Sequence, residues 1–241
     1  MKYFIISDVH GFFDEMIKSL AEAGFDRNNN NHTLVIAGDP LDRGGKPLEV
    51  IEYLESLERV ILIKGNHEYM LEEVMEHNEI TPIDVYNGLD ITVKALLDKY
   101  SEKEDGTWSL TKAAVDRFHS KFINFFETEH YIFVHSWIPT PRIYGEYTYT
   151  DNWRELDDEW ENASWMDPFR ASRKGLNQTG KTIVFGHKRC SIGWAMDSNY
   201  KIDDYGKTAC WDIYRNEKLG VIGIDGCTVV TGKCNVLVLE D

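Results

Sequence analysis

The sequence predicts an α/β fold, and two patterns support this. Between residues 2 and 77, short apolar runs rich in β-branched residues alternate with segments that have the periodicity of amphipathic helices. Most of these runs are continuously apolar, which is typical of strands covered on both faces. In such folds the functional groups lie at the carboxyl ends of strands, so the residues that follow each run are the first candidates for a site.

Seven apolar runs are expected to be strands. They cover residues 2–7, 33–37, 59–64, 131–135, 182–186, 220–224 and 235–239. The first run is similar to the start of a signal peptide, but it ends at Ser7 and is too short for a secretory apolar core. The last two runs predict a hairpin around Gly226 and Gly232.

Three amphipathic helices are expected between the early strands. The first has an apolar stripe over residues 13–21 and a stop signal at Gly24. The second follows Pro47, a residue that suits the first turn of a helix. The third opens at His67.

The middle of the chain differs from the N-terminal part. Residues 78–128 have helical apolar spacing without an expected strand, so they predict a helical cap beside the site. Residues 136–180 are rich in aromatic and charged residues and predict irregular loops with short helices. We expect a single domain over residues 1–241, with the cap as an insertion within it.

The composition excludes several classes of protein. With 42% apolar and 28% charged residues, the chain is too apolar to be disordered and is typical of a globular protein. No apolar stretch approaches the roughly 18 residues that a membrane span requires. The four cysteines lack the spacing of a zinc site, which favours reduced, buried thiols and a cytoplasmic location.

The net charge of −15 arises from 41 acidic and 26 basic residues. Such a surface repels the backbone of nucleic acids, and no basic cluster in the sequence offsets it. We therefore expect neither nucleic acid nor membrane as a partner. A phosphorylated substrate would need a local positive centre, which bound divalent cations can supply.

Five of the apolar runs end in residues of types that bind metal ions. The motifs are Asp8-x-His10-Gly11, Gly38-Asp39-x-x-Asp42-Arg43-Gly44, Gly65-Asn66-His67-Glu68, Val134-His135 and Gly186-His187. Taken singly, each has a structural explanation, such as a core histidine, a helix N-cap or a turn residue. Taken together, they are what a two-metal hydrolytic centre requires, because two ions clamp the attacking and leaving oxygens and acidify a bound water.

Asp39 is the natural bridge between two such ions, because it is central in sequence and cations about 3.5–4 Å apart need a shared anion. Asp8 and His10 are one residue apart, so their side chains would diverge in an extended strand. The chain must therefore bend at Gly11 for both to reach one ion. Nitrogen and oxygen donors without thiolate favour Mn, Fe or Zn over Mg or Ca, and we expect two Mn²⁺ ions.

This ordered series of motifs resembles the calcineurin-like metallophosphoesterases over residues 1–187, and more loosely at Ile224-Asp225-Gly226. The Gly-Asp-x-x-Asp-Arg-Gly form is most similar to their serine/threonine phosphoprotein phosphatase branch, including its small bacterial and phage members. The resemblance implies a four-layer α/β/β/α sandwich of two mixed β-sheets flanked by helices. It also implies the ligands of two metals: Asp8, His10 and the bridging Asp39 for the first, completed for the second by Asn66, His135 and His187.

The resemblance further implies that His67 is the general acid that protonates the departing alkoxide, and that Asp42 orients it. Arg43 offers a planar fork for two phosphate oxygens, with a salt bridge to Glu49 or Glu52 as the alternative.

Substrate binding departs from the family pattern. Many relatives have a second phosphate-binding arginine two residues after a tryptophan, where this chain has Asp167 after Trp165. We expect Arg170 to substitute for it, with Arg173 as the alternative.

The favoured function is that of a serine/threonine protein phosphatase, which hydrolyses phosphomonoesters with a hydroxide that bridges the two metals. The first alternative is the same chemistry on a small molecule, such as a diadenosine polyphosphate or another nucleotide, since the tryptophan-rich region could form a stacking wall as well as a peptide groove. The second alternative is a non-catalytic metal-binding protein of this fold. It predicts substituted ligands or a substituted His67, and the sequence has neither.

Overall fold

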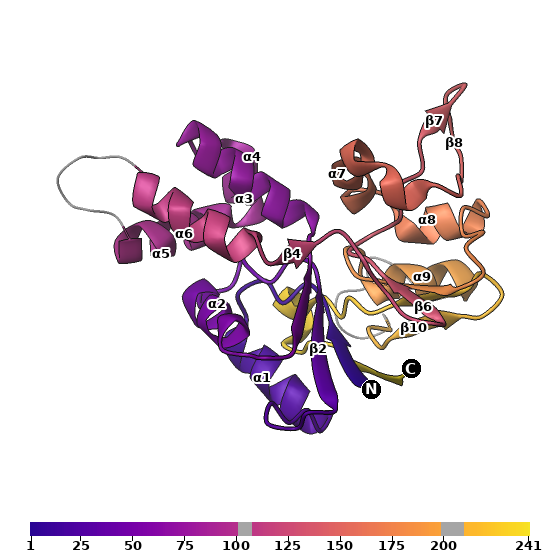
Figure 1. The fold of residues 1–241 in the computed structure, drawn as a ribbon, viewed down its shortest axis with the longest axis horizontal. Helices are drawn as coiled ribbons and strands as arrows, with labels where there is room; N and C mark the ends of the chain where they lie inside the picture. The colour runs from indigo at the N-terminus through magenta and orange to yellow at the C-terminus, as the bar shows by residue number, and fades with distance from the viewer. Residues whose placement is uncertain (101–107, 199–209) are drawn as a thin grey trace.

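The computed structural model describes residues 1–100, 108–198 and 210–241, and it confirms the expected sandwich of two mixed β-sheets (Figure 1). The first sheet has the order β12 (Leu237–Glu240), β1 (Lys2–Ile6), β2 (His32–Ala37), β3 (Val60–Ile63) and β4 (Phe122–Ile123). The second has the order β10 (Tyr214–Asn216), β11 (Val221–Gly223), β9 (Thr182–Phe185), β6 (Tyr131–Phe133) and β5 (Phe126–Glu127). Within each sheet the central strands are parallel, whereas β12, β10 and β5 pair antiparallel to their neighbours.

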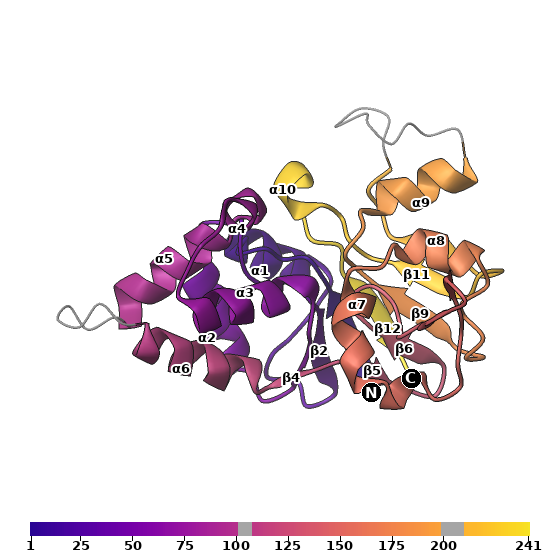
Figure 2. The ribbon, with the colours of Figure 1, turned by 90° about the horizontal axis from the view of Figure 1, so that it is seen from above.

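Helices cover the outer face of each sheet, as Figure 2 shows from above. Beside the first sheet lie α1 (Phe13–Glu22), α2 (Pro47–Glu55), α3 (Asn66–His77), α4 (Pro82–Asn87), α5 (Leu89–Tyr100) and α6 (Ser109–His119). Beside the second lie α7 (Trp160–Ser164), α8 (Pro168–Arg173) and α9 (Cys190–Asp197), preceded by the 3₁₀ turns Trp153–Glu155 and Asp157–Glu159. The short helix α10 (Thr228–Thr231) and the hairpin of β7 (Arg142–Ile143) and β8 (Glu146–Tyr147) complete the described elements.

Alternate residues of each central strand pack into different layers of the core. In β1, Ile5 packs between the two sheets, whereas Phe4 faces the helices of the first sheet. In β6, Phe133 packs between the sheets and Ile132 faces the helices of the second sheet. Because side chains alternate along a strand and both faces are buried here, the strands read as continuous apolar runs.

The expected hairpin at the C-terminal end is wrong. β11 lies in the second sheet beside β9 and β10, and β12 lies in the first sheet antiparallel to β1. The segment between them is longer than a hairpin turn and contains α10, so it passes from one sheet to the other.

Within the described residues, the expectation of helix over 78–128 is correct up to His119; residues 101–107 lie outside the described part of the chain. Helices α4, α5 and α6 are present, but the residues after them form the edge strands β4 and β5. The run Phe122-Ile123-Asn124-Phe125-Phe126 is short and apolar, and such a run fits helical and strand periodicity equally well. The segment forms strands because β4 pairs with β3 and β5 pairs with β6.

Within the described residues, no helix is long and apolar enough to cross a membrane. All four cysteines have free thiols.

Candidate metal centre

The structure brings the six expected metal ligands together at one edge of the two sheets. Each follows the carboxyl end of a strand: Asp8 and His10 follow β1, Asp39 follows β2, Asn66 follows β3, His135 follows β6 and His187 follows β9. Three strands of the first sheet and two of the second therefore contribute. All but His187 are at most 4% exposed, and a pocket of about 190 Å³ opens among them.

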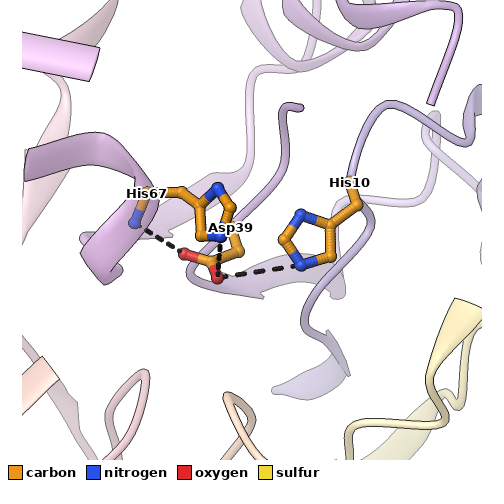
Figure 3. Close-up of side chains that lie close together, drawn as sticks. All are labelled: His10, Asp39 and His67. Atoms are coloured by element: carbon orange, nitrogen blue, oxygen red, sulfur yellow. Dashed lines mark hydrogen bonds and ion pairs between the residues drawn. The ribbon is translucent and has the colours of Figure 1, made fainter. Parts of the chain in front are cut away.

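Asp39 lies at the centre of the cluster. Its Oδ2 is 3.4 Å from His135 Nε2, 3.8 Å from His10 Nε2 and 3.9 Å from His67 Nε2, and Figure 3 shows His10 and His67 on either side of it. Two groups of possible metal ligands, His10–Asp39–His67 and Asp39–His135–His187, share this carboxylate. A shared central anion is what the bridging assignment requires, and that assignment stays a prediction.

The hydrogen bonds of the histidines show that the cluster fits cations. His10 Nδ1 lies 3.0 Å from the carbonyl oxygen of Leu41, and His135 Nδ1 lies 2.9 Å from that of Ala37. A carbonyl oxygen only accepts, so in each neutral ring Nδ1 carries the hydrogen and Nε2 presents its lone pair. These lone pairs face the acceptor oxygen Oδ2 of Asp39. A cation between them would turn this repulsion into attraction.

A second set of atoms that could bind a metal ion lies around the side chain of Asn66. Its amide oxygen Oδ1 is 2.9 Å from His135 Nε2 and 3.0 Å from His187 Nδ1. The backbone N–H of His187 donates to Asp8 Oδ2 at 3.0 Å, so this contact links the two halves of the cluster. The donor set is entirely nitrogen and oxygen, which suits Mn, Fe or Zn.

The electrostatics of the cluster favour the ligand forms of His10 and Asp39, whereas burial raises the pKa of Asp8. Burial lowers the pKa of His10 well below its usual value, so the ring is neutral. Burial alone would raise the pKa of Asp39, but the adjacent His135, His67 and His10 bring it below the ordinary range of a carboxyl. A neutral imidazole and an ionised carboxylate are the forms that bind metal.

The backbone bend that aims Asp8 and His10 is not confined to Gly11. Asp8 and His10 themselves adopt left-handed conformations, each with φ of 50°, and Asp39 does the same with φ of 55°. Such conformations cost roughly 1–3 kcal/mol each in non-glycine residues and concentrate at functional sites. They replace the divergence of an extended strand with side chains that point into one space.

Backbone contacts hold these bends in place. The N–H of Asp8 donates to the carbonyl of Gly38 at 3.1 Å, and that of His10 donates to the carbonyl of Asp39 at 3.0 Å. The buried Glu68 accepts from the N–H of Asp39 at 3.1 Å. Burial and the nearby Asp39 raise the pKa of Glu68 to about 8.

Two glycines leave the space that the ligands fill. A Cβ at Gly38 would lie 2.2 Å from His135 Nδ1, and a Cβ at Gly186 would lie 2.3 Å from Asp8 Oδ2. A methyl group at either position would therefore displace a ligand.

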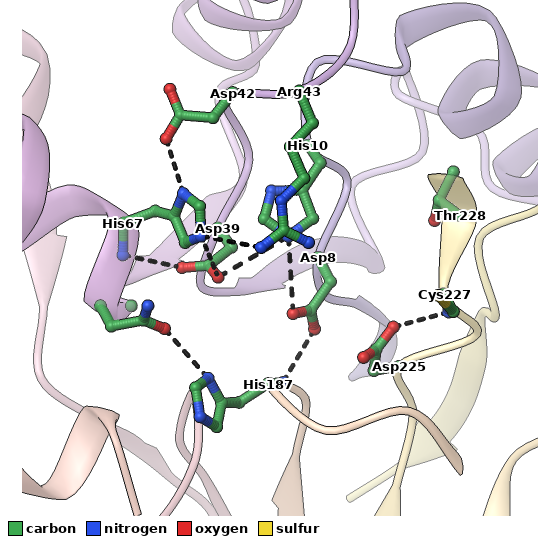
Figure 4. A network of polar contacts seen from close by, with 12 residues as sticks. Asp8, His10, Asp39, Asp42, Arg43, His67, His187, Asp225, Cys227 and Thr228 are labelled. Atoms are coloured by element: carbon green, nitrogen blue, oxygen red, sulfur yellow. Dashed lines mark hydrogen bonds and ion pairs between the residues drawn. The ribbon is translucent and has the colours of Figure 1, made fainter. Parts of the chain in front are cut away.

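His67, Asp42 and Arg43 form a connected set beside Asp39 (Figure 4). His67 Nδ1 lies 2.7 Å from Asp42 Oδ2, and Arg43 Nη2 lies 3.2 Å from His67 Nε2. Burial alone would lower the pKa of His67, but the charge of Asp39 and the hydrogen bond with Asp42 raise it to about 9 against the opposing effect of Arg43. The contact of Nδ1 with Asp42 leaves Nε2 of His67 facing Asp39.

The helical segment after α3 positions this set, a role that the sequence analysis did not assign. Thr92 Oγ1, from α5, accepts from the N–H of Asp42 at 2.9 Å. The carbonyl of Asn87 accepts from Arg43 Nε at 3.4 Å, and that of Gly88 accepts from the N–H of Arg43 at 3.2 Å. Among the described residues, Arg43 forms neither of the alternative salt bridges, to Glu49 or to Glu52; Glu52 pairs with Lys99 at 2.6 Å.

The structure does not bring Arg170 to the site. Its side chain is 76% exposed and pairs with Asp167 at 3.4 Å. The alternative, Arg173, pairs with Asp197 instead. Asp167 caps α8 by accepting from the backbone N–H of Arg170, which places the arginine on the outer helix.

Several residues that line the pocket received no role from the sequence, among them Lys188, Asp225 and Trp165. Lys188 directly follows a ligand, and Asp225 follows the end of β11, so position after a strand was the available signal for both. Burial, and then the charge of Asp8, raise the pKa of Asp225 well above its usual value. Trp165 carries no such signal, because it lies in a loop between α7 and α8.

Two of the curated proteins that are similar to this chain are named as bis(5′-nucleosyl)-tetraphosphatases. The chain is 36% identical over 105 residues to an asymmetrical bis(5′-nucleosyl)-tetraphosphatase of Bacillus velezensis. The matched segment covers 40% of this chain and 41% of the relative. It is 43% identical over 72 residues to a symmetrical bis(5′-nucleosyl)-tetraphosphatase of Klebsiella pneumoniae, which covers 30% of this chain and 25% of that relative. The match thus spans less than half the length of these relatives.

Among solved structures, the fold is similar to that of a protein serine/threonine phosphatase from Saccharomyces cerevisiae. The TM-score is 0.60 at 14% sequence identity, over 93% of this chain and 67% of the other. At this identity the likeness supports the fold alone. The family model of the calcineurin-like phosphoesterases matches residues 1–222. Because that match spans nearly the whole sequence and the motifs behind it supply the clustered ligands, this chain belongs to the calcineurin-like phosphoesterases.

Proposed function

We propose that this chain is a two-metal hydrolase that cleaves dinucleoside polyphosphates, with diadenosine tetraphosphate as the representative substrate. The serine/threonine phosphatase activity that the sequence favoured is not confirmed, since its support is a likeness of fold. Both relatives described above are named as dinucleoside tetraphosphatases, which favours the first alternative.

The observation that carries the proposal is a pair of cationic side chains beside the candidate metal centre. Arg43 and Lys188 both line the pocket that contains Asp39. A phosphomonoester presents a single phosphoryl group, which two metal ions largely neutralise. A tetraphosphate chain presents several anionic groups in a row, so it gains from further cations next to the metals.

The proposed ligands overlap with the two groups found in the structure, but the first of these groups contains His67, whereas the proposal takes Asp8, whose Oδ1 lies 4.0 Å from His10 Nε2. Asp8, His10 and Asp39 would hold one ion, and Asn66, His135 and His187 would hold the other together with Asp39. When bound, the two ions lower the pKa of coordinated water and stabilise charge on phosphoryl oxygens.

The remaining roles belong to His67, Asp42 and Arg43. Asp42 holds Nδ1 of His67 at 2.7 Å, so Nε2 faces the centre and can give a proton to the leaving oxygen. The guanidinium Nε of Arg43 donates to the carbonyl of Asn87, and its backbone N–H donates to that of Gly88, so the side chain is positioned for its Nη atoms to bind phosphate oxygens.

The first prediction concerns the substrate. With Mn²⁺, the enzyme should hydrolyse diadenosine tetraphosphate with a kcat/KM at least about tenfold above that for a phosphoserine peptide, because only the polyphosphate uses the additional cations. Chromatography of the nucleotide products and phosphate release from the peptide measure the two rates. Efficient turnover of the peptide together with an inert dinucleotide would reject the proposal.

The second prediction concerns Lys188. Lys188→Met should raise KM for diadenosine tetraphosphate roughly tenfold, because it removes a charge-assisted contact to the polyphosphate. Lys112→Met, on α6 and paired with Asp116, is the matched control and should leave KM unchanged. Equal KM values for the two variants would show that Lys188 does not bind the substrate.

The third prediction concerns the space around the ligands. Gly38→Ala should bind fewer than two equivalents of Mn²⁺ after dialysis, because the new methyl group overlaps the ring of His135. Gly24→Ala is a matched control: the two glycines have φ of +83° and +82°, but nothing lies within 4 Å of a Cβ at Gly24. Gly24→Ala should lose about 1–2 kcal/mol of stability from its backbone alone and keep both ions. Plasma mass spectrometry of the metal content checks this, and two equivalents in Gly38→Ala would contradict it.

The fourth prediction concerns His67. His67→Ala should reduce kcat by about 10²–10⁴ on phenyl phosphate, whose leaving group needs a proton. The loss on p-nitrophenyl phosphate should be much smaller, because nitrophenolate departs without an acid. Equal losses on both substrates would argue against the role of His67 as proton donor.

A further inference from the structure

A second pocket lies beside the candidate metal centre and has no role in the chemistry described so far. It encloses about 490 Å³ and is lined by the hairpin β7–β8, by α7 and by the loop after it. Trp165 lines both pockets, so the second is adjacent to the first. Figure 1 shows the hairpin projecting beyond α7 and α8, and Arg142 and Tyr147 from it line the pocket. The size falls within the range of about 300–1,000 Å³ that is typical of small-molecule sites.

Flat groups line this pocket. The indole of Trp165 is 47% exposed and lies edge-on to the ring of His187, with 6.2 Å between centroids. On the hairpin, the guanidinium of Arg142 lies over the ring of Tyr147, 4.6 Å from its centroid, and donates to its hydroxyl at 2.9 Å. Nucleobases stack on aromatic rings and on guanidinium planes of this kind.

Polar groups in the same pocket match the edges of a nucleoside. Asn162 carries both a donor and an acceptor on its amide, the pair that recognises the N6 and N7 positions of adenine. Glu159 accepts from Asn162 Nδ2 at 3.2 Å, and its second oxygen is an acceptor for ribose hydroxyls. The polarisable thioether of Met166 completes the wall and is fixed by the hydroxyl of Thr140.

We infer that this pocket is a nucleoside subsite, which takes the adenosine-type end of a substrate whose phosphates reach the metal centre past Trp165. The inference deepens the proposed function and rests on it for the class of ligand. It goes beyond it in assigning Tyr147, Arg142 and Asn162 to base recognition. A compact pocket with stacked flat groups suits one base better than an extended peptide.

The test compares two inhibitors of p-nitrophenyl phosphate hydrolysis by the Mn²⁺ enzyme. Inorganic phosphate reaches the metal centre alone, whereas adenosine 5′-monophosphate adds a base and a ribose. For the unmodified enzyme we expect the nucleotide to inhibit at a concentration at least about tenfold lower than phosphate, because stacking adds affinity. Equal inhibition constants would overturn the subsite.

Variants on one hairpin locate the effect. Tyr147→Ala should bring the two inhibition constants together, and Tyr147→Phe, which keeps the ring, should keep them apart. Tyr144→Ala is the matched control, since Tyr144 lies on the same hairpin, is fully exposed and does not line the pocket. Asn162→Ala is an independent second variant that should weaken only the nucleotide. A preserved difference in Tyr147→Ala, or an equal loss in Tyr144→Ala, would reject the inference.

Turnover of diadenosine tetraphosphate in the same preparations separates the two hypotheses. Turnover without any difference between the inhibitors leaves the proposed function standing and removes the subsite. A difference that Tyr147→Ala abolishes, without turnover of the dinucleotide, supports the subsite and removes the proposed function.

Discussion

The carboxylate of Asp39 is the constraint on which the rest of the site depends. Its Oδ2 faces the Nε2 atoms of His135 and His10 at 3.4 and 3.8 Å. The two rings have already given their Nδ1 hydrogens to backbone carbonyls. The protein thus holds lone pairs toward one another in a buried space, which is costly unless cations lie between them. Left-handed backbone at Asp39 and its neighbours adds further strain that metal binding would offset.

This arrangement requires both sheets to be packed before it exists. The ligands on β1, β2 and β3 belong to one sheet, whereas His135 and His187 follow strands of the other. The layer of Ile5, Val35 and Phe133 between the sheets therefore sets the distances within the cluster. Gly38 and Gly186 remove the side chains that would keep the two halves apart. The geometry of the site therefore depends directly on how the two sheets pack against each other.

The sequence was sufficient for the seven apolar strands and for the clustering of the six candidate ligands at strand ends, because a buried strand leaves a strong apolar signal and its last residues are held rigidly. It was insufficient where the answer depends on tertiary packing. The bend at Asp8 and His10 lies in their own backbone, which a strand pattern does not report. Arg170 was chosen by its distance along the chain, yet the cap at Asp167 turns it outward. The sequence did not assign Trp165 to the site, because its contact with His187 depends on how the loop folds back in three dimensions.

The charge of the chain also acquires a different meaning once the pockets are located. A net charge of −15 repels any polyphosphate at long range. Salt screens that repulsion beyond a Debye length of about 8–10 Å, so the groups within that distance of the bound ligand dominate its binding. Those groups include Arg43 and Lys188 in one pocket and Arg142 in the next. Under the proposed function, these cations together with the two metal ions would offset the carboxylates of Asp8, Asp39 and Asp225 that line the same pocket. Selectivity among phosphate esters would then depend on how many of these cations a substrate can reach, rather than on the charge of the protein as a whole.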